Sequence, residues 1–349
     1  MEEFNSDTSY FDGLRKKYVE NAKKYYPNFE FGSMETGLIF DGELPPFEFE
    51  FRLNSKCIKG TEYEVIEESN LIHYTFSPKN VIEILNSEVL RLSNLVNVND
   101  PQEMNSIIKK ANIKNFVPYI EALKSIYFSA SFCKVINDEK PDEFPMWRLY
   151  GNDGRGCAIV FEIENYKKDW YNLILSNVQY DPCAAVDTFI EFINSHYSFQ
   201  ESNNFPLKNI PITITSLLAF HKNEIWKYEN EVRLLTYQNY DEYTLKPIDD
   251  SYCELKHSIS ADNKRYSYVE LPLYGGKEYN RINREGKLDS FYNILPVLKI
   301  KEIILGYRIE TNSRNNIIEA VNFISKSYGY FIPVKESHIK EWFYDLSPG

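Results

Sequence analysis

The chain has 349 residues, of which 43% are hydrophobic and 15% aromatic, which is enough for a substantial core. Its 39 basic and 51 acidic residues give a net charge of −12, which disfavours unspecific attraction to nucleic acid or anionic membranes. The start of the chain lacks the basic and apolar stretches of a signal peptide, and no apolar run approaches the roughly 20 residues that span a bilayer. We therefore expect a cytoplasmic globular protein with no membrane partner.

The first 70 residues differ in character from the rest. A helix is expected near 7–24, and the alternation of Phe47–Leu53 predicts a strand after a loop-like stretch. We interpret residues 1–70 as an N-terminal accessory segment and residues 71–349 as the main domain.

The main domain mixes short strands with helices. Ser77 and Pro78 form an N-cap and a first helical turn directly after a strand. Because strands and helices do not alternate regularly, the pattern predicts an α+β fold. The expected elements are, in order, a strand at 71–76, a helix with Val81, Ile84 and Leu85 on one face, a strand at 89–95, a turn at 99–101, a helix near 102–123, a strand at 126–132, a turn at 152–156, a strand at 157–163, helices within 184–220, strands beginning near 229, 268 and 300, and a helix at 313–328 with Ile317, Ile318, Val321 and Ile324 inward.

Several familiar sites are absent from the sequence. Five scattered cysteines without a Cys-x-x-Cys pair predict reduced thiols, with Cys133 and Cys157 beside core strands. No glycine-rich dinucleotide loop, P-loop, nucleophile elbow or HExxH helix occurs, and the aspartates do not form a metal-nuclease pattern. We predict no metal site.

The motif LIHYTF (Leu71–Phe76) offers two short polar groups on one strand face. His73 and Thr75 suit the hydroxyls of a ribose. The alternative is a histidine satisfied by a nearby backbone group. In the later strand, Ser129 and Ser131 share a face and point either toward a ligand or beneath a packed helix.

The motif MWRLYG (Met146–Gly151) precedes a glycine-rich turn. Trp147 and Tyr150 provide rings that stack on a flat heterocycle, and the guanidinium of Arg148 suits a pyrophosphate. The alternative is that both aromatics belong to the core and that Arg148 is a surface salt-bridge partner.

The motif YENEVRLL (Tyr228–Leu235) carries alternating charges. Glu229, Glu231 and Arg233 are expected on one strand face, and this pattern is also typical of a solvated face with charge pairs. A buried carboxylate at this point would stabilise positive charge on a ribosyl carbon during glycosidic cleavage. The spacing alone does not choose between the two glutamates.

Taken in order, these motifs resemble a family of bacterial proteins associated with abortive infection and phage defence. The resemblance rests on HYT, LRLSN with NDPxE, SASF, MWxxYG, YExEVRL and IKEIILG, and it runs from about Leu71 to the C-terminus. More distantly, the chain is similar to DarT-like ADP-ribosyltransferase-fold proteins, whose opening strand, helix and small second strand resemble LIHYTF, SPKNVIEIL and LRLSN.

This resemblance implies an ADP-ribosyltransferase-like split antiparallel sheet core, with flanking helices and an N-terminal extension, that binds NAD as a substrate. It further implies that Glu231 holds the nicotinamide ribose and stabilises an oxocarbenium-like transition state, with Glu229 as the competing catalytic residue. It implies that His73 and Thr75 bind the adenosine ribose of NAD and that Ser131 belongs to a supporting strand. It also implies that Trp147 and Tyr150 bind the nicotinamide ring and that Arg148 faces the pyrophosphate.

The leading hypothesis is a phage-defence toxin or effector that cleaves NAD and passes ADP-ribose to water or to an unidentified protein or nucleic acid. A phage component or an antitoxin is a further candidate partner. One alternative is a non-catalytic sensor or binding module that uses the same cleft. Another is a nucleic-acid-processing effector, with Lys109, Lys110 and Lys114 as its basic strip.

Overall fold

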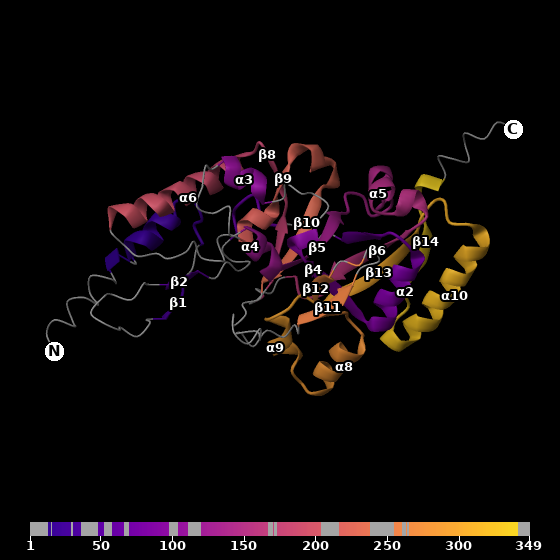
Figure 1. Cartoon of the computed structure of the whole chain (residues 1–349). Helices are drawn as coiled ribbons and strands as arrows, with labels where there is room; N and C mark the ends of the chain where they lie inside the picture. Colours follow the sequence, from indigo (N-terminus) through magenta and orange to yellow (C-terminus); the bar gives the residue numbers. More distant parts are fainter. Residues whose placement is uncertain are drawn as a thin grey trace. The chain divides into compact units, whose positions relative to one another are not determined.

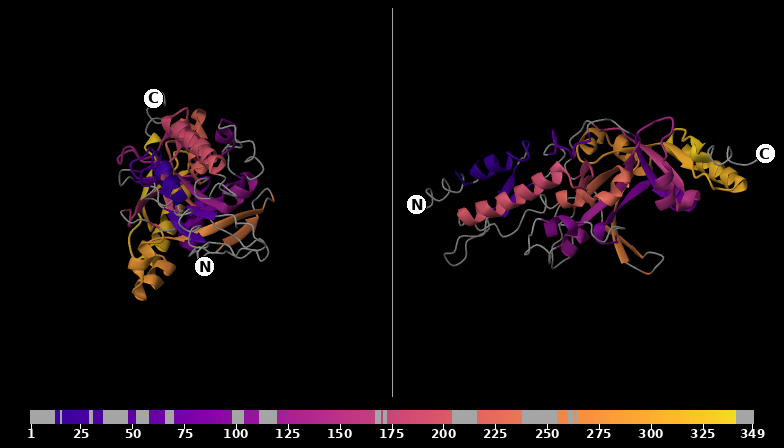
Figure 2. Two further views of the ribbon diagram at one scale, coloured as in Figure 1. Left: turned by 90° about the vertical axis from the view of Figure 1, so that its left-hand side faces the viewer. Right: turned by 90° about the horizontal axis from the view of Figure 1, so that it is seen from above.

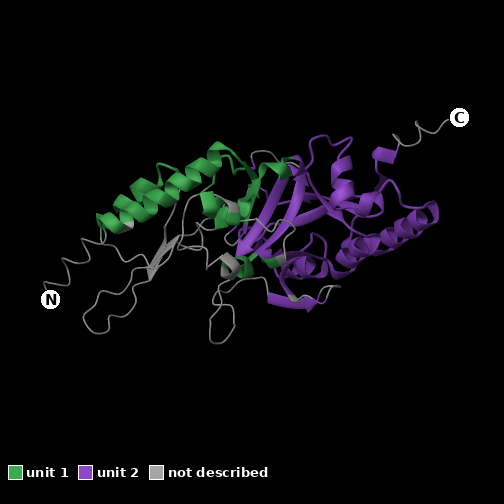
Figure 3. Ribbon diagram, turned by 45° about the horizontal axis from the view of Figure 1, so that its top comes forward, with its two compact units in different colours: residues 1–64, 96–127, 174–227 green, residues 65–95, 128–173, 228–349 purple. Residues whose placement is uncertain are grey.

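The structure is a computed structural model, and its contacts divide the chain into two compact units (Figure 3). Unit 1 combines Met1–Glu64, Val96–Tyr127 and Ile174–Lys227, so the N-terminal segment shares a unit with two later segments. Unit 2 comprises Val65–Leu95, Phe128–Leu173 and Tyr228–Gly349. The structure describes residues 13–14, 16–28, 31–35, 48–51, 58–65, 70–97, 104–110, 120–166, 170, 173–203, 216–237, 255–259, 263 and 265–340.

Unit 2 contains a mostly antiparallel sheet flanked by helices, which confirms the α+β prediction (Figure 1). Its strands are β3 (Leu71–Thr75), β4 (Val89–Asn94), β5 (Tyr127–Lys134), β6 (Cys157–Ile163), β10 (Glu231–Tyr237), β11 (Leu255–Ile259), β12 (Arg265–Pro272), β13 (Leu298–Leu305) and β14 (Val334–Glu336). The sheet order is β11-β12-β4-β5-β3-β6-β13-β14, and β10 pairs with β5. Pairs along this order are antiparallel, except for the parallel pair of β13 and β14.

The predicted helix after the first strand is confirmed. Ser77 is extended and Pro78 begins α2, and Val81 and Leu85 are fully buried on its inner face. The last predicted helix is confirmed as α10, which lies beside α2 (Figure 1), where the Tyr328 hydroxyl donates to the Leu85 carbonyl at 2.9 Å. The helices of unit 2 are α2 (Pro78–Ser87), α5 (Phe144–Leu149), α8 (Lys277–Arg284), α9 (Leu288–Tyr292) and α10 (Thr311–Tyr328).

Unit 1 is organised around the long helix α6. Within the first predicted helix, residues 13–14 and 16–22 are helical, and this helical segment lies along α6 (Figure 2). The rings of Tyr18 and Phe199 meet edge to face at 5.3 Å. The elements of this unit are β1 (Phe31–Glu35), β2 (Glu48–Phe51), α3 (Asn105–Lys110), α4 (Ile120–Ile126), β7 (Leu173–Asn177), β8 (Gln179–Asp181), α6 (Ala184–Ser202), η4 (Ser216–Phe220) and β9 (His221–Asn223).

The helix predicted near 102–123 is described only in part. The structure has helix α3 at its start and helix α4 at its end, and the residues 111–119 between them lie outside the described ranges. The turn predicted at 99–101 also lies outside them. Among the described residues, Cys133, Cys157 and Cys183 are free thiols, and Cys157 is buried in β6 as expected.

Two buried histidines of unit 1 each contact a tyrosine hydroxyl. Nδ1 of His196 lies 2.7 Å from the hydroxyl of Tyr18, and Nε2 of His221 lies 2.7 Å from that of Tyr63. Burial lowers the pKa of His196 to about 4 and that of His221 to about 3, because a charged imidazole loses its hydration there. Both side chains are therefore neutral at pH 7.

We expect the free energy of unfolding to fall as pH is lowered from about 7 to 4. The folded-state pKa values lie below the ordinary value of 6.5, so the unfolded chain binds protons in this window that the native chain does not. Each histidine contributes at most about 1.4 kcal/mol per pH unit. Urea unfolding at pH 7.0 and 5.5 measures the effect.

His196→Gln should reduce this pH dependence, because it removes one of the histidines whose pKa is lowered by burial. His257→Gln is the matched control, since His257 is exposed on β11. An undiminished pH dependence in His196→Gln would contradict the assignment.

Candidate functional site

The two glutamates of YENEVRLL are buried at the start of β10. Glu229 is 3% exposed and ends the 3-10 turn η5 (Glu224–Glu229), while Glu231 is 4% exposed and begins the strand. Between them Asn230 has φ 43° and turns the backbone. One expectation is therefore corrected, since Glu229 does not lie on the strand. Of the two readings of the charged face, the structure has the buried one. Residues 231–236 are buried on both faces of β10.

Glu231 forms an ion pair inside the strand. Oε1 of Glu231 accepts hydrogen bonds from Nε and Nη2 of Arg233 at 3.1 and 2.9 Å, and Arg233 is only 1% exposed. Residues two apart on a strand share a face, which brings the two groups together. A guanidinium removed from water needs such a partner, because an unpaired buried charge is strongly unfavourable.

Tyr150 joins this cluster from a different part of the chain. It caps the C-terminal end of α5, and its hydroxyl donates a short hydrogen bond to Oε1 of Glu229, 79 positions later. Burial raises the pKa of Tyr150, and the hydrogen bond to Glu229 and the negative charges of Glu229 and Glu231 raise it further. The phenol thus stays protonated and remains a donor. The motifs MWRLYG and YENEVRLL meet at this point.

Helix α5 is held in place by a buried carboxylate. Asp142, just before the helix, accepts hydrogen bonds from Nε1 of Trp147 at 2.7 Å and from the Ser337 hydroxyl, and it lies 2.6 Å from Nδ1 of His338. After the helix, a side chain at Gly151 would place its Cβ 2.3 Å from the indole ring. The glycine therefore lets the chain turn closely over Trp147 and direct Tyr150 toward Glu229.

Two of the predicted ligand-binding residues have partners other than the two glutamates. Trp147 is fully buried, and its ring meets that of Tyr74 edge to face at 5.1 Å, so it belongs to the core. Arg148 is exposed, with Nε 3.6 Å from Oδ1 of Asp153, so it is a surface ion-pair partner. Neither placement puts the side chain beside Glu229.

His73 and Thr75 are engaged with neighbouring backbone. Nδ1 of His73 lies 3.0 Å from the carbonyl oxygen of Ser131, an exposed residue of β5, and burial lowers the pKa of the imidazole. The Thr75 hydroxyl donates to the Cys157 carbonyl at 2.8 Å. Alternation along β3 places both side chains on the face opposite Tyr74, whereas Tyr150 packs against the cluster that contains Tyr74. The described contacts join Tyr150 to Glu229 and not to His73.

Residues 146–234 match the model of the family DUF2971, which is described as a protein of unknown function. The matched segment begins on α5 and ends on β10, so it contains Tyr150, both glutamates and Arg233, but not His73. A search of curated proteins found no match, and a search of solved structures found none.

Among the residues that the structure describes, no three His, Cys, Asp or Glu side chains are grouped so that they could hold a metal ion. The described helices include none with an apolar stretch of the length needed to span a bilayer.

We expect Glu231→Gln to lower the free energy of unfolding by about 3–5 kcal/mol, because it removes a carboxylate that is bonded to the buried guanidinium of Arg233. Urea unfolding followed by tryptophan fluorescence measures this change. Glu83→Gln is the control, since Glu83 forms an exposed pair with Lys79 at 3.5 Å and pairs of this kind contribute at most about 1 kcal/mol.

The double variant Glu231→Gln/Arg233→Met should recover part of the loss, since it removes the buried charge together with its partner. A single variant as stable as the wild type would show that the ion pair does not support the strand.

Proposed function

We propose that this protein is an ADP-ribosyltransferase-like enzyme that cleaves NAD at the bond between nicotinamide and ribose. The observation that carries the proposal is the cluster of Tyr150 with the buried carboxylates of Glu229 and Glu231. The acceptor of the ADP-ribose is water or a macromolecule. The split-sheet ADP-ribosyltransferase fold, the DarT-like kinship and the role as a phage-defence effector are proposed on the sequence resemblance alone.

The chemistry of NAD explains why a buried carboxylate suits this reaction. When the glycosidic bond breaks, the electron pair leaves with nicotinamide, which becomes neutral, and positive charge develops on the ribosyl carbon. A carboxylate in a water-poor site stabilises that charge more strongly than it would in water. The acceptor oxygen then bonds to the carbon, and its proton passes to a nearby base. Glu229 and Glu231 are the carboxylates of the cluster.

The hydrogen bond from Tyr150 favours Glu229 for the charge-stabilising role, although the sequence resemblance favoured Glu231. Oε1 of Glu231 accepts two hydrogen bonds from the guanidinium of Arg233, and these hold that carboxylate against its own strand. The Glu229 carboxylate is instead positioned by a phenol that comes from a different motif. We assign Glu229 the catalytic role, with Tyr150 orienting it, and Glu231 the role of a partner to Arg233. The half-buried ring of Tyr150 orients Glu229 and offers a surface for nicotinamide.

The other predicted roles are not part of the cluster. The contacts of His73, Thr75 and Trp147 give no support to NAD binding by these residues.

The two alternative functions have less support. A non-catalytic binding module would be favoured by a glutamate directed to solvent, and Glu231 is buried. A nucleic-acid-processing effector needs a basic strip, but Lys110 lies 2.7 Å from Asp181 and 3.3 Å from Asp187. Lys109 is exposed, and Lys114 lies outside the described residues.

The direct test is to incubate the purified protein with NAD and to measure nicotinamide by chromatography, with and without cell extract as a source of acceptor. We expect nicotinamide release in at least one condition. If no release occurs under any condition, and calorimetry detects no NAD binding, the proposal is wrong.

Variants test the residue assignment. Glu229→Gln should lower the rate of nicotinamide release by about 10²–10³-fold, as is typical when one charge-stabilising group is lost. Tyr150→Phe should lower it by roughly tenfold, because Glu229 loses one orienting hydrogen bond worth about 1.5 kcal/mol. The controls are Glu83→Gln on the exposed face of α2 and Tyr266→Phe on β12. Unchanged turnover in Glu229→Gln would contradict only its catalytic assignment.

A further inference from the structure

Three exposed arginines of unit 2 converge on one aspartate. Nη1 of Arg308 contacts Oδ2 of Asp153 directly, Nη1 of Arg155 lies 4.0 Å from the same oxygen, and Nε of Arg148 lies 3.6 Å from Oδ1. The Tyr307 hydroxyl donates to Oδ1 at 3.3 Å. Within the described ranges, Asp153 is the one carboxylate within ion-pair distance of these guanidinium groups.

The backbone fixes this cluster from two directions. Asn152, Asp153 and Gly154 all have positive φ, at 51°, 53° and 80°, which turns the chain sharply and presents the Asp153 carboxylate. The amide of Arg308 donates to the Gly154 carbonyl at 2.8 Å. A Cβ at Gly306 would lie 2.3 Å from that oxygen, so glycine is needed for the approach. Arg308 is therefore brought to Asp153 by main-chain contacts as well as by charge.

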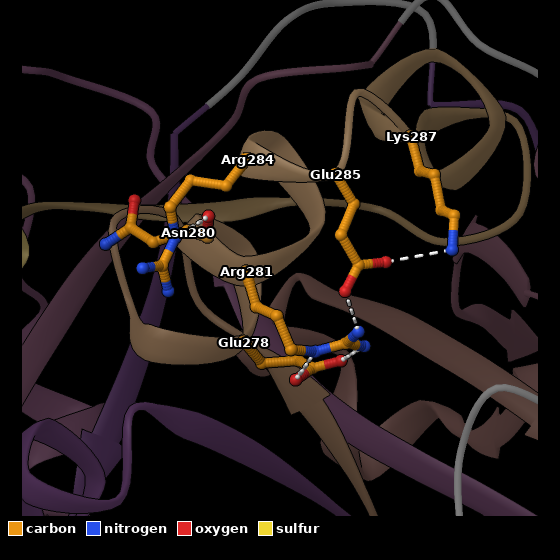
Figure 4. A network of polar contacts seen from close by, with 6 residues as sticks. All are labelled: Glu278, Asn280, Arg281, Arg284, Glu285 and Lys287. Atoms are coloured by element: carbon orange, nitrogen blue, oxygen red, sulfur yellow. Dashed lines mark hydrogen bonds and ion pairs between the residues drawn. The ribbon is translucent and has the colours of Figure 1, made fainter.

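The charges of this cluster are unbalanced. Three positive groups and one negative group leave two positive charges, on a chain whose net charge is −12. The exposed face of α8 gives a contrast (Figure 4), because Arg281 there lies between two carboxylates, bonded to Glu278 at 2.6 Å and to Glu285 at 2.5 Å. The arginines around Asp153 keep guanidinium donors that Asp153 does not occupy. Guanidinium groups of this kind bind phosphate with paired, charge-assisted hydrogen bonds.

We propose that Arg148, Arg155 and Arg308 form a binding site for a phosphate group of a small ligand, such as a nucleotide or a pyrophosphate-containing metabolite. Asp153 holds the three side chains in place when the site is empty. Because the three arginines converge on a single carboxylate, the site suits an anion of small size. The net negative charge of the chain repels a long polyanion. The site goes beyond the proposed cleavage of NAD, and it binds phosphate whether or not NAD is cleaved.

Calorimetric titration of the intact chain with inorganic pyrophosphate tests the site. We expect saturable binding that weakens with added salt, and the double variant Arg155→Ala/Arg308→Ala should weaken it at least tenfold, the effect of losing charge-assisted hydrogen bonds. Asp153→Asn should strengthen it several-fold, because it removes the competing negative charge and keeps a residue that tolerates positive φ.

The matched control is Arg281→Ala/Arg284→Ala, which removes the same number of exposed arginines from α8. Its affinity for pyrophosphate should equal that of the wild type. An equal loss in both double variants would overturn the proposal, and so would the absence of saturable binding in the wild type. A 5′-phosphorylated oligonucleotide that binds the same arginines more tightly than pyrophosphate would overturn the assignment to a small ligand. Nicotinamide release and pyrophosphate binding are measured in separate assays, so one proposal can be wrong while the other holds.

Discussion

The polar centre of unit 2 depends on the pairing of Arg233 with Glu231 inside a strand buried on both faces. An ion taken out of water remains charged only where an opposite charge accompanies it, and the penalty for an unmatched ion is several kcal/mol. The first residues of β10 therefore carry negative charge for structural reasons. That same concentration of carboxylates, with a phenol attached to Glu229, makes the region suitable for stabilising a cation. Stability and the proposed chemistry rest on the same few side chains.

The position of Tyr150 follows from the packing of α5 rather than from the strand it reaches. The helix is short, with six residues from Phe144 to Leu149, and an isolated helix of this length is unstable in water. Its indole lies in the core, and its first turn follows the hydrogen-bonded Asp142. The direction of the Tyr150 phenol is consequently fixed by the packed helix. A residue that orients a catalytic group needs a rigid support of this kind.

Local patterns in the sequence predicted the elements well, and non-local pairing explains what they could not predict. The strand at Leu71 and the helix after Ser77-Pro78 follow from alternation and capping chemistry, which involve only neighbours. The alternating charges after Glu229 fitted a solvated face as well as a buried carboxylate, because nothing local shows that Arg233 and Glu231 pair in the interior. Likewise, the burial of Trp147 depends on Asp142 and on residues near the C-terminus. The approach of Tyr150 to Glu229 spans 79 positions, and only the ordered motifs pointed to it.

The carboxylate of Asp142 also bears on how the protein is made. Its partners Ser337 and His338 follow it by 195 and 196 positions, after the last strand. During synthesis on the ribosome, α5 emerges long before those two residues, so the buried network that fixes it is incomplete while most of the chain is being translated. The tyrosine reaches its final orientation only when residues 337–338 have left the ribosomal tunnel. A nascent chain therefore does not yet contain the finished contact between Tyr150 and Glu229.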